Sequence, residues 1–117
     1  TGEFHPDAIA RTHTAVDKFA AEIVRRGVER IRFCATSATR DAKNRDLFID
    51  GVKSRLGVAP EVISGEEEAA LSFAGATKEM LDSLSPYLVV DIGGGSTEFV
   101  IGDRTEDKAK SVNIGCV

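Results

Sequence analysis

The feature that most constrains the fold is an apolar run, YLVVDI at 87–92, that leads directly into GGGST at 93–97. A near-continuous apolar run of this length is typical of a strand that is covered on both faces. The segment STEFVIG at 96–102 alternates like a returning strand, and SVNIGCV at 111–117 is expected to form a third strand after a polar turn. The pattern therefore predicts a β-meander built around a glycine loop.

The residues before the meander alternate between helical and strand-like patterns. In chain order we expect a helix over 6–26, a strand over 31–36, a polar turn over 36–44, a helix over 45–56 capped by Asn44, a strand over 61–64 and a helix over 66–82. The whole order is α-β-α-β-α-β-β-β with short connections, which predicts a mixed α/β architecture.

Composition restricts the class of protein. The chain has 117 residues, 42% of them hydrophobic, which is enough for one ordinary domain with a core. Apolar runs are too short to span a bilayer and the first residues lack signal-peptide features, so we expect a cytoplasmic protein without a membrane partner. The net charge of -4 argues against a nucleic-acid partner. Cys34 and Cys116 lie in strand-like stretches and are expected to be reduced and buried.

The glycine loop has the donors of an anion site. Successive backbone N–H groups in such a turn can point into one concavity, and nearby hydroxyls can add to them. These donors are the amides of Gly93, Gly94, Gly95 and Ser96 and the hydroxyls of Ser96 and Thr97. Asp91 would fit as a ligand, direct or through water, of a Mg²⁺ that neutralises a bound phosphate. The alternative is a plain hairpin in which the glycines relieve twist.

Two other segments carry candidate site residues. SGEEEA at 64–69 places three glutamates where a strand gives way to a helix; they can simply complement the helix dipole, or one can act as a general base on water. Arg40 can bind a phosphate in a bidentate manner, or it can pair with Asp41 or Asp46 in a solvated loop. The hydroxyls near Arg40 belong to Thr36, Ser37 and Thr39.

Four segments together resemble a known family. They are ATSATRDA at 35–42, EVISGEEEA at 61–69, VVDIGGGSTEFV at 89–100 and NIGCV at 113–117. In this order they resemble the exopolyphosphatase and guanosine pentaphosphate phosphatase (Ppx/GppA) family, over essentially the whole chain. The resemblance implies an α/β fold of the actin-like ATPase and sugar-kinase superfamily, with a ribonuclease-H-like core in each of two lobes. Residues 1–72 would form the later part of the first lobe, and 73–117 the opening of the second.

The resemblance also implies an activity and residue roles. Family members remove the terminal phosphate of inorganic polyphosphate or guanosine pentaphosphate (pppGpp) with Mg²⁺ or a similar divalent cation. Glu68 matches the general base, Asp91 the metal-associated aspartate and Glu98 a second acid near the metal. The phosphate-binding positions of the family match Arg40 and the loop residues Gly93, Gly94, Gly95 and Ser96.

One departure from the family pattern limits the match. Family members begin with an earlier strand that carries a DxGxxS-type phosphate loop, and nothing before Ala35 resembles it. We therefore expect an internal fragment that is inactive alone and whose exposed strand edges promote oligomerisation or element swapping. The full-length parent is expected to be a homodimer. Two alternatives stay open: an actin-like ATPase or kinase domain, and a non-catalytic sensor of polyphosphate or nucleotides.

Overall fold

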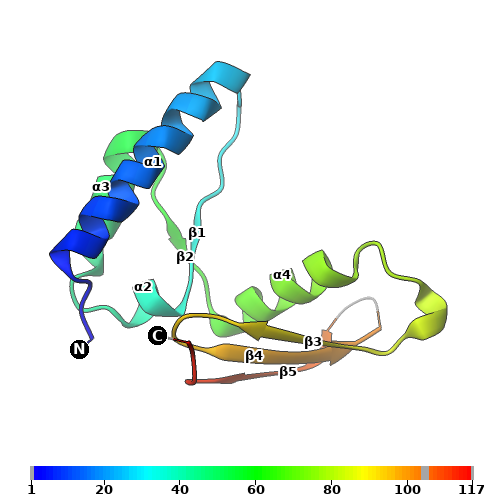
Figure 1. The fold of residues 1–117 in the computed structure, drawn as a ribbon. Coiled ribbons are helices and arrows are strands. Elements are labelled where there is room, and N and C mark those ends of the chain that lie inside the picture. Colours follow the sequence, from blue (N-terminus) through cyan, green and yellow to red (C-terminus); the bar gives the residue numbers. More distant parts are fainter. Residues whose placement is uncertain (1, 104–105, 117) are drawn as a thin grey trace. The chain divides into compact units, whose positions relative to one another are not determined.

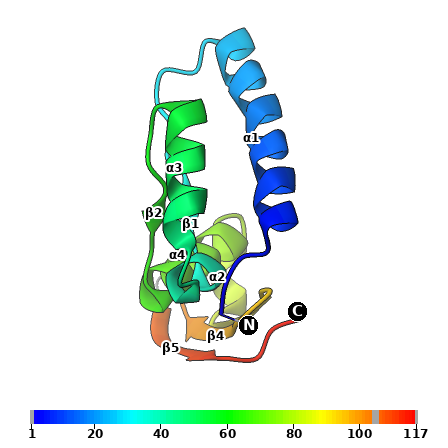
Figure 2. The ribbon, with the colours of Figure 1, turned by 90° about the vertical axis from the view of Figure 1, so that its left-hand side faces the viewer.

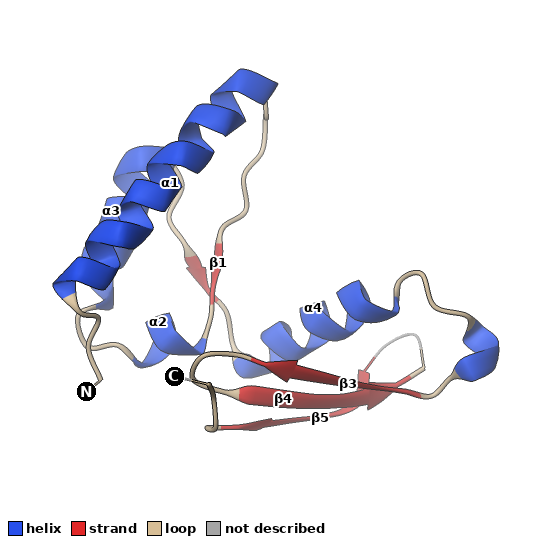
Figure 3. Cartoon of the chain, viewed as in Figure 1, coloured by secondary structure: helices blue, strands red, loops and turns tan. Residues whose placement is uncertain are grey.

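A computed structural model describes residues 2–103 and 106–116 of the chain. The chain divides into two compact units. The first consists of Thr1–Ala35 and Thr39–Val62, and the second of Thr36–Ala38 and Ile63–Val117. In chain order the elements are α1 (Pro6–Arg26), β1 (Cys34–Ala35), α2 (Ser37–Asp41), α3 (Arg45–Leu56), β2 (Glu61–Val62), α4 (Gly65–Thr77), the 3₁₀ helix η1 (Asp82–Leu84), β3 (Tyr87–Ile92), β4 (Thr97–Gly102) and β5 (Glu106–Val112) (Figure 1, Figure 3).

The first unit is a helical pair beside a short parallel strand pair. Helices α1 and α3 lie side by side (Figure 2), and β1 pairs with β2 through Cys34–Glu61 and Ala35–Val62. The apolar stripes of the two helices meet in the core of this unit. Its buried members are Val16, Ala35, Phe48 and Val52, with Phe4, Phe33, Ile49 and Leu56 packed around them.

The second unit is an antiparallel meander, β3-β4-β5, with α4 packed on one face of the sheet. The register pairs Val89 with Val100, and both contact Phe73 or its neighbours on α4. Because side chains alternate along a strand, Asp91 shares this covered face with Val89. Leu88, which precedes Val89, points to the opposite face and is exposed.

Several predictions about these elements are confirmed. The helices over 6–26 and 45–56 have the expected bounds, and Gly27 ends the first with a φ of 63°. Strand β3 covers 87–92 as predicted, and the meander is antiparallel. Apart from these predictions, no helix in residues 2–103 and 106–116 is both long and apolar enough to cross a membrane.

Other predictions about single elements are wrong. The polar turn over 36–44 contains a helix, α2. The third strand of the meander is Glu106–Val112 and not 111–117, because the charged stretch alternates as an edge strand and the chain leaves the sheet after Val112. The strands predicted over 31–36 and 61–64 are only two residues long each in the structure. The helix predicted over 66–82 is shorter at its C-terminal end and spans Gly65–Thr77. Residues 104–105 and Val117 of these predictions lie outside the described residues.

Burial also differs from the prediction. Cys34 and Cys116 are exposed free thiols, and Cys34 is exposed because it alternates with the buried Ala35 in β1. Strand β3 is covered on one face only, since Val90 and Ile92 are exposed beside Leu88. Asn44 precedes α3, but its side chain bonds the backbone of Phe4 and does not cap the helix.

The predicted lobe boundary between residues 72 and 73 lies inside α4, whereas the two compact units divide near residue 62. A lobe of the whole protein and a compact unit of this chain are different divisions. The assignment of 1–72 and 73–117 to two lobes therefore stays a prediction.

Gly75 offers a test of how well α4 is formed. It lies in the helix interior and is exposed, and a Cβ at this position would have no atom within 4 Å. Alanine is favoured over glycine in a helix by about 0.5–1 kcal/mol. We expect Gly75→Ala in the full-length parent to raise the free energy of unfolding by about this amount in urea denaturation. A lower value would show that α4 is not a regular helix here.

Candidate functional site

Residues 93–96, the glycine loop, join β3 to β4 in a tight turn. The amide of Gly93 donates to the carbonyl of Ser96 at 2.9 Å, and a Cβ at Gly93 would lie 3.2 Å from that oxygen. Left-handed backbone is confined, within the described residues, to Gly2, Gly27 and Gly57. The loop glycines are therefore explained by close approach and not by a positive φ.

One partner of this close approach is the segment after β5. A Cβ at Gly115 would lie 2.0 Å from the carbonyl oxygen of Gly94, a distance that no real Cβ could keep. The amide of Cys116 donates to the carbonyl of Gly93 at 3.1 Å, and the hydroxyl of Thr97 donates to the carbonyl of Ile114 at 2.7 Å. Backbone therefore packs directly on backbone at this loop, a contact that was not among the predictions from the sequence.

The hydroxyls around the loop differ in what they can still bind. Ser96 is 2% exposed, and its Oγ has no hydrogen-bond partner among the described residues. The Thr97 proton is already donated to Ile114, so Ser96 is the better placed of the two to donate to an anion. Ser37 is buried, and its Oγ lies 3.3 Å from where a Cβ at Gly95 would stand. The structure thus brings one residue of the TSATR segment to the glycine loop.

Asp91 and Glu98 form an acidic pair on the sheet face covered by α4. They are direct cross-strand partners in the β3-β4 ladder. Glu98 is 1% exposed; its Oε1 accepts a hydrogen bond from Ser111 at 2.8 Å, and its Oε2 is buried with no hydrogen-bond partner in the described part of the chain. Asp91 Oδ2 accepts a hydrogen bond from Ser72 of α4 at 2.7 Å. Carboxylates directly opposite each other on a ladder repel, and burying Glu98 without a cation is costly.

This pair fits the divalent cation that the resemblance implies. Within residues 2–103 and 106–116 no group of three or more His, Cys, Asp or Glu side chains gathers as a metal cage. Mg²⁺ does not need such a cage, because it commonly binds one or two carboxylates and completes its shell with water and substrate phosphate. The buried Oε2 of Glu98 is the observation that supports a cation here. The metal roles of Asp91 and Glu98 stay predictions.

Helix α4 places Glu68 differently from the other two glutamates. Ser64 caps the helix by accepting from the amide of Glu67 at 3.1 Å, and Glu66 and Glu67 are exposed, as expected for residues that complement the helix dipole. Glu68 is half-buried, and it precedes Ser72 by one turn, so it lies on the helix face that meets Asp91. Glu68 therefore shares the helix face of Ser72, whereas Glu66 lies at the pocket between α4 and β5.

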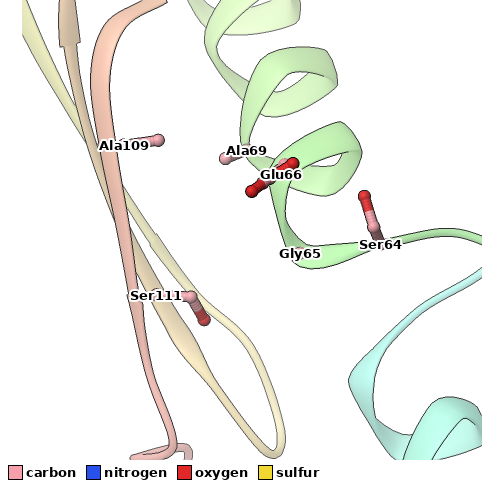
Figure 4. A pocket seen from close by; sticks show the side chains of 6 residues that line it. All are labelled: Ser64, Gly65, Glu66, Ala69, Ala109 and Ser111. Atoms are coloured by element: carbon pink, nitrogen blue, oxygen red, sulfur yellow. The ribbon is translucent and has the colours of Figure 1, made fainter.

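A pocket of about 360 Å³ opens between the first turn of α4 and β5 (Figure 4). Its lining consists of Ser64, Gly65, Glu66, Ala69, Ala109 and Ser111. Ala69 and Ala109 point toward each other across it, and Ser111 is the hydroxyl that holds Glu98. The pocket therefore borders the acidic pair.

The second unit unites most, but not all, of the predicted site. It contains Glu68, Asp91, Glu98 and the glycine loop. Arg40 lies on α2 in the first unit and is half-buried, and its phosphate-binding role stays a prediction. Sequence reasoning missed three residues, Ser72, Ser111 and Gly115. Only the helical spacing of Ser72 from Glu68 and the strand register at Ser111 could have indicated the first two.

Comparison with known proteins identifies close relatives. Exopolyphosphatase 2 of Mycobacterium tuberculosis is 48% identical over 122 residues, which cover 100% of this chain and 38% of that protein. The guanosine-5'-triphosphate,3'-diphosphate pyrophosphatase of Photobacterium profundum is 39% identical over 116 residues, covering 98% and 23%. The chain thus spans less than two fifths of the length of these relatives.

Solved structures and a family model agree with these matches. The crystal structure of an exopolyphosphatase from Cytophaga hutchinsonii superposes with a TM-score of 0.92 at 32% identity, covering 98% of this chain and 37% of that one. The predicted α/β fold of the actin-like ATPase and sugar-kinase superfamily is confirmed by this likeness. The model of the Ppx/GppA phosphatase family matches residues 1–117. The chain therefore belongs to the Ppx/GppA phosphatase family.

Proposed function

We propose that this chain is part of a longer cytoplasmic hydrolase, the full-length parent, which releases the terminal phosphate of inorganic polyphosphate, pppGpp or both. The observation that carries the proposal is the acidic pair of half-buried Asp91 and buried Glu98, which lies beside the glycine loop and on the side of α4 that holds Glu68. Relatives named for both activities support the substrate class. The parent is expected to be a homodimer, and this chain alone is expected to be inactive.

In the proposed mechanism, Glu68 accepts a proton from a water whose oxygen attacks the terminal phosphorus. The bridging P–O bond then breaks, and the shortened polyphosphate or nucleotide leaves. The amides of Gly94, Gly95 and Ser96, the Ser96 hydroxyl and Arg40 stabilise negative charge on the transferred phosphoryl group, whereas the Gly93 amide already donates to the Ser96 carbonyl. Asp91 and Glu98 would hold Mg²⁺ or a similar divalent cation, which neutralises charge on the phosphate oxygens when bound.

The proposal is tested by phosphate release from the full-length parent with Mg²⁺ and each substrate. We expect release from polyphosphate or pppGpp, and we expect excess ATP not to displace radiolabelled polyphosphate. Hydrolysis of ATP alone would favour the actin-like ATPase or kinase instead, because a glycine loop of this kind can hold ATP phosphates equally well. Binding of either substrate without release would indicate a non-catalytic sensor.

A further inference from the structure

The two acids of the second unit are each held by a serine from a different neighbouring element. Ser72 of α4 donates to Asp91 Oδ2 at 2.7 Å, and Ser111 of β5 donates to Glu98 Oε1 at 2.8 Å. Asp91 pairs with Glu98 in the β3-β4 ladder, and Glu98 pairs with Ser111 in the β4-β5 ladder. The four side chains therefore form a continuous row, with the two acids in the middle and a hydroxyl at each end.

A hydroxyl has a different effect on a carboxylate from that of a basic side chain. Serine donates one proton to one oxygen and brings no charge, so the pair keeps both negative charges and its other two oxygens. One of those, Glu98 Oε2, is buried and has no hydrogen-bond partner within residues 2–103 and 106–116. A lysine or arginine at either position would instead neutralise the carboxylate that it held. The row thus orients the acids while preserving their charge.

We propose that Ser72 and Ser111 are positioning residues that fix Asp91 and Glu98 so that each presents its second oxygen to one divalent cation. The inference rests on the proposed function, which assigns a cation to this pair. Hydrogen bonds of this kind to metal-ligating carboxylates commonly determine ligand orientation and metal affinity. Ser72 also lies one turn after Glu68, so its bond to Asp91 fixes the helix that carries the proposed base against the metal ligands.

The test measures Mn²⁺ binding to the full-length parent by electron paramagnetic resonance, without substrate, because Mn²⁺ favours the same oxygen ligands as Mg²⁺. We expect Ser72→Ala and Ser111→Ala each to weaken Mn²⁺ binding by about 10-fold or more. Ser72→Thr and Ser111→Thr keep the hydroxyl and are expected to restore affinity. Ser54→Ala is the matched control, since the Ser54 hydroxyl donates to the Gly51 carbonyl within helix α3 of the first unit.

The outcomes separate this inference from the proposed function. The positioning role is overturned if both alanine variants bind Mn²⁺ as tightly as the parent. It is also overturned if the parent itself does not bind Mn²⁺, even when the parent releases phosphate. Weakened Mn²⁺ binding in a parent that hydrolyses neither substrate supports the positioning role and removes the hydrolase. If an alanine variant does not fold, Ser→Cys at the same position serves in its place, because it nearly keeps the side-chain volume and replaces the hydroxyl with a weak donor. We expect this variant to weaken Mn²⁺ binding to a similar extent.

Discussion

Glu68→Gln in the full-length parent is expected to lower the rate of phosphate release by about 10²- to 10⁴-fold, the usual contribution of a positioned general base. Glutamine has nearly the same shape, so the helix and the half-buried position should be kept, but its amide cannot take a proton from water. Polyphosphate binding should therefore change little. Single-turnover phosphate release and an equilibrium binding assay measure the two effects separately.

Glu67→Gln is the control for this change. It stands one position earlier in the first turn of α4, has the same chemistry and is exposed. If the first-turn glutamates acted only through the helix dipole, both variants would lose similar activity, by the small amount typical of surface charges. We expect only Glu68→Gln to show a large loss. Undiminished turnover in Glu68→Gln would remove Glu68 as the base.

The parts of the fold that could be predicted are those specified by local pattern. The helix over 6–26 has a periodic apolar stripe, an early proline and Gly27 as an end signal, and all three agree. The prediction for residues 106–112 was wrong because the charged composition of EDKAKSV suggested a turn. The segment is instead an edge strand, in which charged side chains are common. The exposed face of β3 was missed because an apolar run does not show which partners are present to cover it.

The site could be predicted only as far as it lies in motifs. Asp91 and Glu98 flank a short glycine turn at equal distances, so their pairing across the hairpin follows once the turn is recognised. Ser72 and Ser111 carry no motif, because their roles depend on the packing of α4 and the register of β5. Serines are common on helices and strands, and only the tertiary structure distinguishes these two from the rest.

Gly115→Ala in the full-length parent should disrupt the glycine loop. The added Cβ would stand 2.0 Å from the Gly94 carbonyl oxygen and 2.6 Å from the Gly95 amide nitrogen, so either the loop or the segment after β5 must move. A displacement of about 1 Å in a substrate-positioning group can lower a rate about 10²-fold. We expect a loss of this order in phosphate release, together with destabilisation of about 1–3 kcal/mol, as in other overpacked sites. Steady-state kinetics and urea denaturation measure both.

Gly75→Ala separates this effect from the general consequences of replacing a glycine. It adds the same methyl group within the same unit, but into open space on α4, where stability should rise and the rate should stay the same. The loss of turnover in Gly115→Ala, compared with its loss of stability, also distinguishes two explanations of the loop. If the loop glycines served only to relieve twist in a hairpin, Gly115→Ala would lower stability without a matching loss of turnover. If the loop amides hold the phosphate, the loss of turnover should exceed what the loss of folded protein can account for.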